Sequence, residues 1–206
     1  LKTMAEEGSL PLAIFPAGTL QPRQSTGYSF YALLGTLKNV FPGVKIVNLN
    51  DTFKTEENRS LAAQLAKTID KKAIIIYTSS NNSHLAYNWK DRINETGKSL
   101  CFFNVIPEMC HNEIVSFESH PGNIISLFLN DPDDHPENKR RINFVSQLLK
   151  ERDVESIHID LGGKNIFEKI WRSINLADWL AFCLAEQNGF DPADIKIIDQ
   201  LKKLMA

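Results

Sequence analysis

Residues 73–106 read AIIIYTSSNNSHLAYNWKDRINETGKSLCFFNVI, and this stretch decides the fold. It opens on an apolar, β-branched run that predicts a strand over Ala73 to Thr78. A helical period follows from Ser83 to Thr96, and a second apolar run predicts a strand over Leu100 to Ile106. Strand, helix and strand in this order are typical of the βαβ unit of a parallel sheet.

The same alternation continues on both sides of this unit. Further strands are predicted over Leu12 to Phe15, Val44 to Leu49, Asn123 to Leu129 and Ser156 to Leu161. Further helices are predicted over Tyr28 to Asn39, Glu56 to Ile69, Asn138 to Arg152, Asn165 to Gln187 and Pro192 to Met205. We therefore predict an α/β fold with a mainly parallel sheet flanked by helices on both faces. The polar segment Asn130 to Glu137 is interpreted as a solvated turn before a helix.

Composition excludes several classes of protein. A formal charge of -2 argues against a phosphate-neutralising surface, so no nucleic-acid partner is expected. The apolar runs fall far short of the roughly 20 residues that cross a bilayer, so no membrane span is expected. The three cysteines show neither a CxxC nor a Cys/His ligand spacing. They are interpreted as reduced cytosolic thiols, which predicts a cytoplasmic protein without a metal site.

One acid stands at an unusual place in the helix predicted from Ser83. Leu85, Trp89 and Ile93 face one side of this helix, whereas Glu95 lies on the opposite, polar side in the last turn before Gly97. The helix macrodipole disfavours an acid there by about 0.3–1 kcal/mol. From position alone, a solvated surface carboxylate is the simpler interpretation of Glu95, and a functional carboxylate is the alternative.

A polar group follows the strand that ends at Pro107. It contains Glu108, His111, Asn112 and Glu113, and it lies at the carboxyl end of a strand, where α/β sheets bind ligands. A histidine there could act as a general acid or base near neutral pH. The alternative is that His111 is merely exposed or caps a helix.

The last predicted helix has a clear start and one misplaced charge. Asp191 is a plausible N-cap and Pro192 suits the first helical position. Lys202 falls between Ile195 and Ile198 on the apolar face of this helix, where a lysine must snorkel, pair or serve a cleft. Snorkelling and a functional role both remain open.

Arg23 lies in a polar loop that leads into the helix predicted from Tyr28, and from position alone it is a surface arginine. The chain contains no GxGxxG, GxxxxGK[ST], HExxH or GxSxG motif. Dinucleotide-binding, P-loop, zincin and serine-hydrolase functions therefore lose their main support. A nucleotide-binding α/β domain is the weakest of the alternatives.

Two stretches follow the pattern of a known family. Residues 89–98 read WKDRINETGK and residues 103–115 read FNVIPEMCHNEIV. They resemble the bifunctional phosphoglucose/phosphomannose isomerases, whose pattern runs WK-x-x-x-NEN-x-K and then N-x-x-PE-x-x-HNEIV. Shorter pieces agree in the same order at residues 21–23 with 27–28, 131–135, 176–179, and 189–192 with 201–202. The resemblance therefore spans nearly the whole chain.

The resemblance implies a three-layer SIS (sugar isomerase) domain, a fold that this family carries twice in tandem. Residues 1–56 are then expected to be the tail of a preceding SIS domain plus a connector, and residues 57–206 the C-terminal SIS domain. The family's phosphate loop, of the type S-x-SGNTEET, matches nothing here, and a polar turn, Thr78 to Ser83, stands where a Gly-rich turn is usual. We therefore expect a fragment that lacks the phosphate loop. Thr96 replaces the second Asn of the NEN pattern.

The resemblance also implies a reaction and its residues. The family interconverts glucose 6-phosphate and fructose 6-phosphate through a cis-enediolate, and mannose 6-phosphate is a further candidate substrate. It implies that Glu95 is the base that moves a proton between C2 and C1. His111 and Lys202 would assist ring opening, and Arg23 would stabilise the enediolate.

The same resemblance bears on cofactors and partners. The scheme needs no metal and no cofactor, and the family's active site lies at the interface of a homodimer. The histidine of that site reaches across from the neighbouring subunit. A sugar-phosphate-sensing SIS module without catalysis is the alternative function, and it would need none of these four residues in register.

Overall fold

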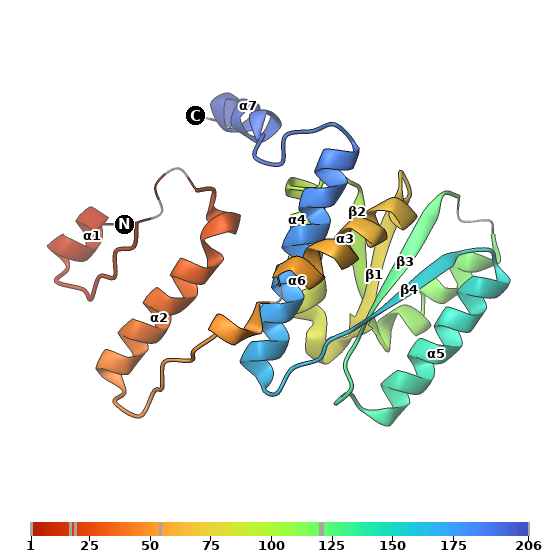
Figure 1. The fold of residues 1–206 in the computed structure, drawn as a ribbon, viewed down its shortest axis with the longest axis horizontal. Coiled ribbons are helices and arrows are strands. Elements are labelled where there is room, and N and C mark those ends of the chain that lie inside the picture. Colours follow the sequence, from red (N-terminus) through yellow and green to blue (C-terminus); the bar gives the residue numbers. More distant parts are fainter. Residues whose placement is uncertain (1, 17, 19, 54, 120–121, 206) are drawn as a thin grey trace. The chain divides into compact units, whose positions relative to one another are not determined.

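The computed structural model describes residues 2–16, 18, 20–53, 55–119 and 122–205. The chain divides into two compact units, unit 1 within residues 1–48 and unit 2 within residues 49–206. Figure 1 shows the elements of both units along the chain.

Unit 1 is helical. Its elements are the α-helix α1 (Lys2–Glu7), the 3-10 helix η1 (Pro22–Ser25) and the α-helix α2 (Thr26–Val40). The ring of Phe15 stacks on Tyr28 with centroids 5.7 Å apart, and the Tyr31 hydroxyl donates to the carbonyl of Val47 at 3.0 Å. These contacts attach the irregular segments on either side of α2 to that helix, which was predicted over Tyr28 to Asn39.

The two strands predicted in this part of the chain are wrong. Residues 12–15 and 44–49 form no strand. Leu12, Ile14 and Ile46 are exposed, and the described residues of unit 1 contain no other strand with which these runs could pair. An apolar run becomes a strand only when a neighbour completes its hydrogen bonds. Pro11, Pro16 and Pro42 have no backbone N–H, so they further limit the hydrogen bonds that a strand in these segments could make.

Unit 2 contains a four-stranded parallel sheet in the order β2-β1-β3-β4. The strands are β1 (Ala73–Ser79), β2 (Cys101–Ile106), β3 (Ile124–Asn130) and β4 (Glu155–Asp160). The bounds of each strand differ by at most one residue from those of a predicted strand, so the α/β fold with a parallel sheet is confirmed. β1 lies between β2 and β3, which makes β2 and β4 the edge strands.

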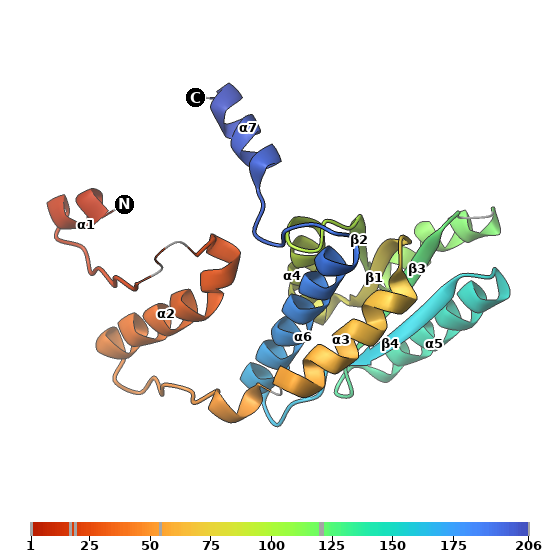
Figure 2. The ribbon, with the colours of Figure 1, turned by 45° about the horizontal axis from the view of Figure 1, so that its top comes forward.

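Helices cover both faces of this sheet (Figure 2). One face carries α3 (Thr55–Ile69), α4 (Ser83–Glu95) and α6 (Ile166–Gln187). The other face carries α5 (Pro136–Glu151) and two 3-10 helices, η4 (Glu108–Cys110) and η5 (Glu113–Glu118). A further 3-10 helix, η2 (Asn50–Thr52), precedes α3, and another, η3 (Ser80–Asn82), precedes α4. The three-layer architecture predicted for this region is therefore present.

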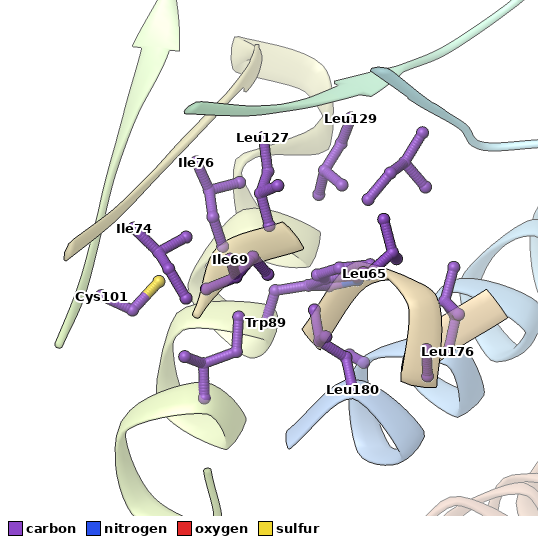
Figure 3. Close-up of a cluster of buried hydrophobic side chains, with 14 of the residues drawn as sticks. Leu65, Ile69, Ile74, Ile76, Trp89, Cys101, Leu127, Leu129, Leu176 and Leu180 are labelled. Atoms are coloured by element: carbon purple, nitrogen blue, oxygen red, sulfur yellow. The ribbon is translucent and has the colours of Figure 1, made fainter. Parts of the chain in front are cut away.

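Two hydrophobic clusters fill the spaces between the layers, because alternate strand residues point to opposite faces. Ile74 and Ile76 of β1 pack with Trp89 of α4 and Leu180 of α6 in the larger cluster (Figure 3). The indole N–H of Trp89 donates to the Ser173 hydroxyl at 2.8 Å, which satisfies the one polar atom of this fully buried side chain.

Tyr77 and Phe128 point to the other face, where they pack with α5 and the two 3-10 helices. The side chains of this second cluster come from β1, β2, β3, η4, η5 and α5, together with Val154, which precedes β4. Met109 of η4 and Phe117 of η5 are both buried there, so the segment that follows β2 is part of the core on this side of the sheet.

The final helix, α7 (Lys196–Met205), starts later than the predicted Pro192. The Asp191 side chain accepts from the amide of Ala193 at 2.8 Å, and Asp194 in turn accepts from the amide of Lys196 at 2.8 Å. Both aspartates close a turn on the amide two residues on. Because the second of these turns precedes the helix, Asp191 is not the N-cap and Pro192 is not the first helical residue.

Candidate functional site

Glu95 is the last residue of α4, and it opens onto a pocket of about 700 Å³. The pocket lies between the end of α4 and the segment that leads into α7. Its lining is Asn94, Glu95, Lys98, Ser99, Leu100, Phe190, Asp191, Asp194, Ile195, Lys196, Ile197 and Ile198. Glu95 is partly buried there, so the simple interpretation of a fully solvated carboxylate does not describe it.

Backbone-directed hydrogen bonds fix the end of α4. The Asn94 side chain accepts from the amide of Cys101 at 2.8 Å and donates to the Cys101 carbonyl at 3.2 Å. The Lys98 ammonium donates to the Glu95 carbonyl at 2.6 Å and also to the carbonyl of Asp194. Lys98 thus satisfies a carbonyl at the helix C-terminus and joins α4 to the far wall of the pocket.

Gly97 allows this turn to pack against α6. A Cβ atom on Gly97 would lie 2.7 Å from the carbonyl oxygen of Ile93 and 3.2 Å from that of Ala181. Both neighbours are backbone atoms, which cannot move aside as a flexible side chain can. A glycine is therefore required where α4 ends against α6.

Asn94, Gly97 and Lys98 hold the end of α4 in place, and the sequence analysis did not single them out. All three lie in the motif stretch of residues 89–98, which was their only signal in the sequence. The side-chain contacts that give them this role were not visible in the pattern, because Asn94 bonds to a residue in the next strand and Lys98 to a residue 96 positions away.

Lys202 lies farther along α7 and is not among the described residues that line the pocket. Its side chain is exposed, and its ammonium lies 3.9 Å from Asp199. α7 has no buried residue in the described part of the chain, and Ile197, Leu201 and Leu204 are exposed on it. The apolar face that was predicted for this helix is therefore uncovered here, and the role of Lys202 stays a prediction.

His111 lies at the other end of β2 from Glu95. It follows η4, its backbone amide donates to the Glu108 carbonyl at 3.0 Å, and its residue is exposed. Glu95 is joined to the start of β2 by residues 96–100, whereas His111 comes after its end. The strand has six residues and spans about 20 Å. One chain therefore does not bring Glu95 and His111 together.

Arg23 belongs to unit 1 and lies in η1. The carbonyl of Arg23 accepts from the Thr26 hydroxyl at 2.9 Å, and the Ser25 hydroxyl donates to the carbonyl of Pro22 at the same distance. The Gln24 side chain accepts from the amide of Gln21 at 2.9 Å. This short turn leads directly into α2, and the role of Arg23 stays a prediction.

At the carboxyl edge of the sheet, where β1 and β3 end, side chains bind one another. The Asp131 carboxylate accepts from the Lys169 ammonium at 2.7 Å and from the Asn82 amide at 3.0 Å. Lys169 also donates to Asp133 at 3.2 Å, and its own side chain is 9% exposed. Burial alone would raise the pKa of Asp131, but its hydrogen bonds, with the charge of Lys169, outweigh burial and lower it.

Residues 130–137 form a turn before α5, as interpreted, and most of them are exposed, whereas Asp131 and Asp134 are largely removed from water. The network also uses the polar turn that follows β1. The Thr78 hydroxyl donates to the Leu129 carbonyl, the Ser80 hydroxyl to the Ile106 carbonyl and Asn82 to Asp131. The donors of these three side chains are therefore directed into the protein.

Among the described residues, no group of three or more His, Cys, Asp or Glu side chains could hold a metal ion. The described helices are each too short or too polar to cross a membrane. The cysteines Cys101, Cys110 and Cys183 are free thiols. Burial raises the pKa of Cys101 to about 12, against a smaller opposing effect of Lys90, so this thiol stays protonated at neutral pH.

Two relatives cover nearly the whole chain. A bifunctional phosphoglucose/phosphomannose isomerase of Caldicellulosiruptor bescii is 34% identical over 229 residues, which cover 100% of this chain and 66% of that protein. The protein of the same name from Aquifex aeolicus is 30% identical over 211 residues, which cover 98% of this chain and 64% of that protein. The chain thus spans slightly less than two thirds of the length of these relatives.

Solved structures share the fold at low sequence identity. Glucosamine-6-phosphate deaminase of Thermotoga maritima is 12% identical with a TM-score of 0.61, covering 92% of this chain and 60% of its own. A glucose-6-phosphate isomerase-like protein of Thermus thermophilus is 20% identical with a TM-score of 0.54, and the match covers 69% of this chain and 46% of that chain. These neighbours confirm the SIS-type architecture of the sheet and its helices.

The family assignment rests on the region that contains this sheet. Residues 58–205 match the family model described as the bacterial phospho-glucose isomerase C-terminal SIS domain. The matched region includes all four strands and both motif stretches, and it agrees with the resemblance seen in the sequence. The chain belongs to the family of bacterial phosphoglucose isomerase C-terminal SIS domains.

Proposed function

We propose that the protein containing this chain is an aldose-ketose isomerase that interconverts glucose 6-phosphate and fructose 6-phosphate. Mannose 6-phosphate is proposed as a second aldose substrate. The observation that carries the proposal is a carboxylate, Glu95, at a pocket of about 700 Å³ in a domain of the phosphoglucose isomerase family. The names of the relatives from Caldicellulosiruptor bescii and Aquifex aeolicus support both substrates.

In the proposed reaction, Glu95 removes the proton from C2 of the open-chain sugar phosphate and returns it to C1. A general base must lie within hydrogen-bond reach of the proton that it removes. The position of Glu95 at the end of α4, on the lining of a pocket of about 700 Å³, supports this role. The cis-enediolate intermediate carries negative charge on oxygen, and Arg23 is proposed to stabilise that charge.

Ring opening is proposed to use His111 and Lys202 as proton donor and acceptor. Within one chain, His111 and Glu95 lie at opposite ends of β2, a distance of about 20 Å along the strand. We therefore propose a homodimer in which Glu95 works with His111 of the partner subunit. A two-fold axis would complete two such sites at once, as an isologous interface requires.

The domain division is proposed to follow the resemblance, with residues 1–56 completing a preceding SIS domain and residues 57–206 forming the second. The phosphate group is proposed to bind outside the second domain. Two observations support this: the side-chain donors of Thr78, Ser80 and Asn82 are directed into the protein, and the chain spans 64–66% of its relatives' lengths.

The test is solvent hydrogen exchange at C2 of glucose 6-phosphate, measured by NMR in D2O with the full-length protein, beside a coupled assay for fructose 6-phosphate. An isomerase should exchange the C2 hydrogen and release product, and the same measurement with mannose 6-phosphate tests the second substrate. Saturable binding of glucose 6-phosphate with no exchange would refute the isomerase and support the alternative, a sugar-phosphate-sensing SIS module.

A further inference from the structure

The segment that carries His111 is held at both ends by buried side chains. It consists of η4 and η5, and His111 lies exposed between them. Met109 of η4 is fully buried and Phe117 of η5 is 2% exposed, and both pack in the cluster that contains Tyr77 and Phe128. Apolar contacts of this kind hold the segment against the sheet, but they are not directional.

Glu113 supplies directional contacts between this segment and the sheet. One oxygen of its carboxylate accepts from the hydroxyl of Tyr77 at 2.5 Å, and the other accepts from the side-chain amide of Asn104 at 2.5 Å. Tyr77 belongs to β1 and Asn104 to β2. Burial raises the pKa of Tyr77, and the hydrogen bond to Glu113 and its charge raise it further, so the hydroxyl stays a donor.

The same carboxylate is linked to the His111 turn through its neighbour. The amide of Glu113 donates to the side chain of Asn112 at 2.6 Å, and Asn112 donates to the side chain of Glu108 at 2.9 Å. The amide of His111 donates to the carbonyl of Glu108 at 3.0 Å. Residues 108–113 therefore form a hydrogen-bonded turn that contains His111, and Glu113 joins this turn to two strands by side-chain hydrogen bonds.

We propose that Glu113 is a positioning residue for His111, acting through its hydrogen bonds to Tyr77 and Asn104. The proposal rests on the proposed function of His111 in ring opening. Met109 and Phe117 keep the segment on the sheet, whereas Glu113 fixes the rotation of the turn and with it the direction in which the imidazole leaves the surface. Hydrogen bonds can do this because they weaken steeply when they are bent.

The test compares Glu113→Ala and Glu113→Gln with a matched control, Glu118→Gln, in the full-length protein. Glu118 is the last residue of the same 3-10 helix and is exposed. A misplacement of about 1 Å can cost on the order of 100-fold in rate, so Glu113→Ala should lower kcat between about 10- and 100-fold with KM little changed. Glu113→Gln should lie between this variant and wild type, because its single oxygen can accept from only one of the two donors. The control should match wild type.

A second readout is independent of activity. The amide hydrogens of residues 108–113 should exchange with solvent faster in Glu113→Ala than in wild type or Glu118→Gln, and the His111 imidazole should sharpen in its NMR spectrum as it becomes mobile. If wild type shows no isomerisation, the proposed function fails, and this readout still decides whether Glu113 orders His111.

Two results would overturn the inference. One is a Glu113→Ala protein with the kcat and the exchange rates of Glu118→Gln. The other applies if Glu113→Ala does not fold, in which case Tyr77→Phe is used instead. Tyr77→Phe keeps the buried ring and removes one donor to Glu113, so it should reproduce part of the loss in kcat and part of the faster exchange. A Tyr77→Phe protein with the kcat and the exchange rates of wild type would refute the positioning role.

Discussion

In unit 2, the edge of the sheet at which the strands begin (the amino edge) and the edge at which they end (the carboxyl edge) are built differently. At the amino edge, the turn between α4 and β2 is held by contacts to the backbone, and Glu95 opens onto a pocket of about 700 Å³. At the carboxyl edge, side chains bind side chains. Glu113 joins β1 and β2, and Asp131 joins Lys169 to Asn82.

This difference qualifies a general rule. Open α/β sheets bind ligands outside the carboxyl ends of their strands, where the strand order reverses, and in this sheet that point lies between β1 and β3. Here Asn82, which follows β1, and Asp131, which follows β3, are bonded to each other at that point. Between β1 and β3 the carboxyl edge is thus occupied by a hydrogen bond that joins two loops, and the proposed base lies at the opposite edge.

The largest effect should come from the amino edge. Glu95→Gln in the full-length protein should lower kcat for glucose 6-phosphate by roughly 10²–10⁴-fold, the range typical of a removed general base. The amide fills the same space, so urea unfolding should be unchanged. Asp91→Asn is the matched control, since Asp91 lies on the same helix and pairs only at the surface with Lys90. An isomerase that keeps its rate in Glu95→Gln has a different base.

An intermediate effect should come from the turn that holds Glu95. Gly97→Ala would place a Cβ 2.7 Å from the Ile93 carbonyl oxygen, and this overpacking should lower the free energy of unfolding by about 1–3 kcal/mol. Gly162→Ala is the control, because the nearest atom to its Cβ would lie 4.0 Å away on Arg172. Urea unfolding followed by tryptophan fluorescence measures unit 2 alone, since residues 89, 171 and 179, the three tryptophans, lie there. Equal stability of the two variants would contradict the close packing of α4 on α6.

The sequence predicted the fold well where local pattern and tertiary structure agree. The run from Ala73 to Ile106 combines β-branched residues with a helical period, and both became elements within one residue of their expected bounds. It failed for residues 12–15 and 44–49, because a strand depends on a partner that a short apolar run does not reveal. It also misplaced the start of α7, since Asp191 and Asp194 are equally good capping residues and only Asp194 accepts from the first residue of the helix.

The candidate site was predictable only in part. The pattern located Glu95 at the end of a helix and His111 after a strand, as the structure has them. It could not identify the contacts that hold them. Tyr77 is 36 residues from Glu113 and Lys169 is 38 residues from Asp131, and no local period relates residues at such separations. A role in positioning is therefore visible only once the chain is folded.

The smallest effect should come from the carboxyl edge, as a change in how the free energy of unfolding depends on acid pH. The pKa of Asp131 is lowered in the folded state because its hydrogen bonds and the charge of Lys169 outweigh burial, so its contribution to stability is complete above its unfolded pKa of about 3.9. That contribution is lost as the pH falls through the lower folded pKa. Between pH 4 and 2, Asp131→Asn should therefore lose less stability than wild type loses. This difference between the two proteins should be smaller than the loss of stability expected for Gly97→Ala.

Asp133→Asn is the control and should follow wild type, because the Asp133 side chain is 79% exposed and such pairs contribute little. Urea unfolding at three pH values in this range gives the comparison, and equal acid slopes for Asp131→Asn and wild type would show that the network at the carboxyl edge is not held by this carboxylate.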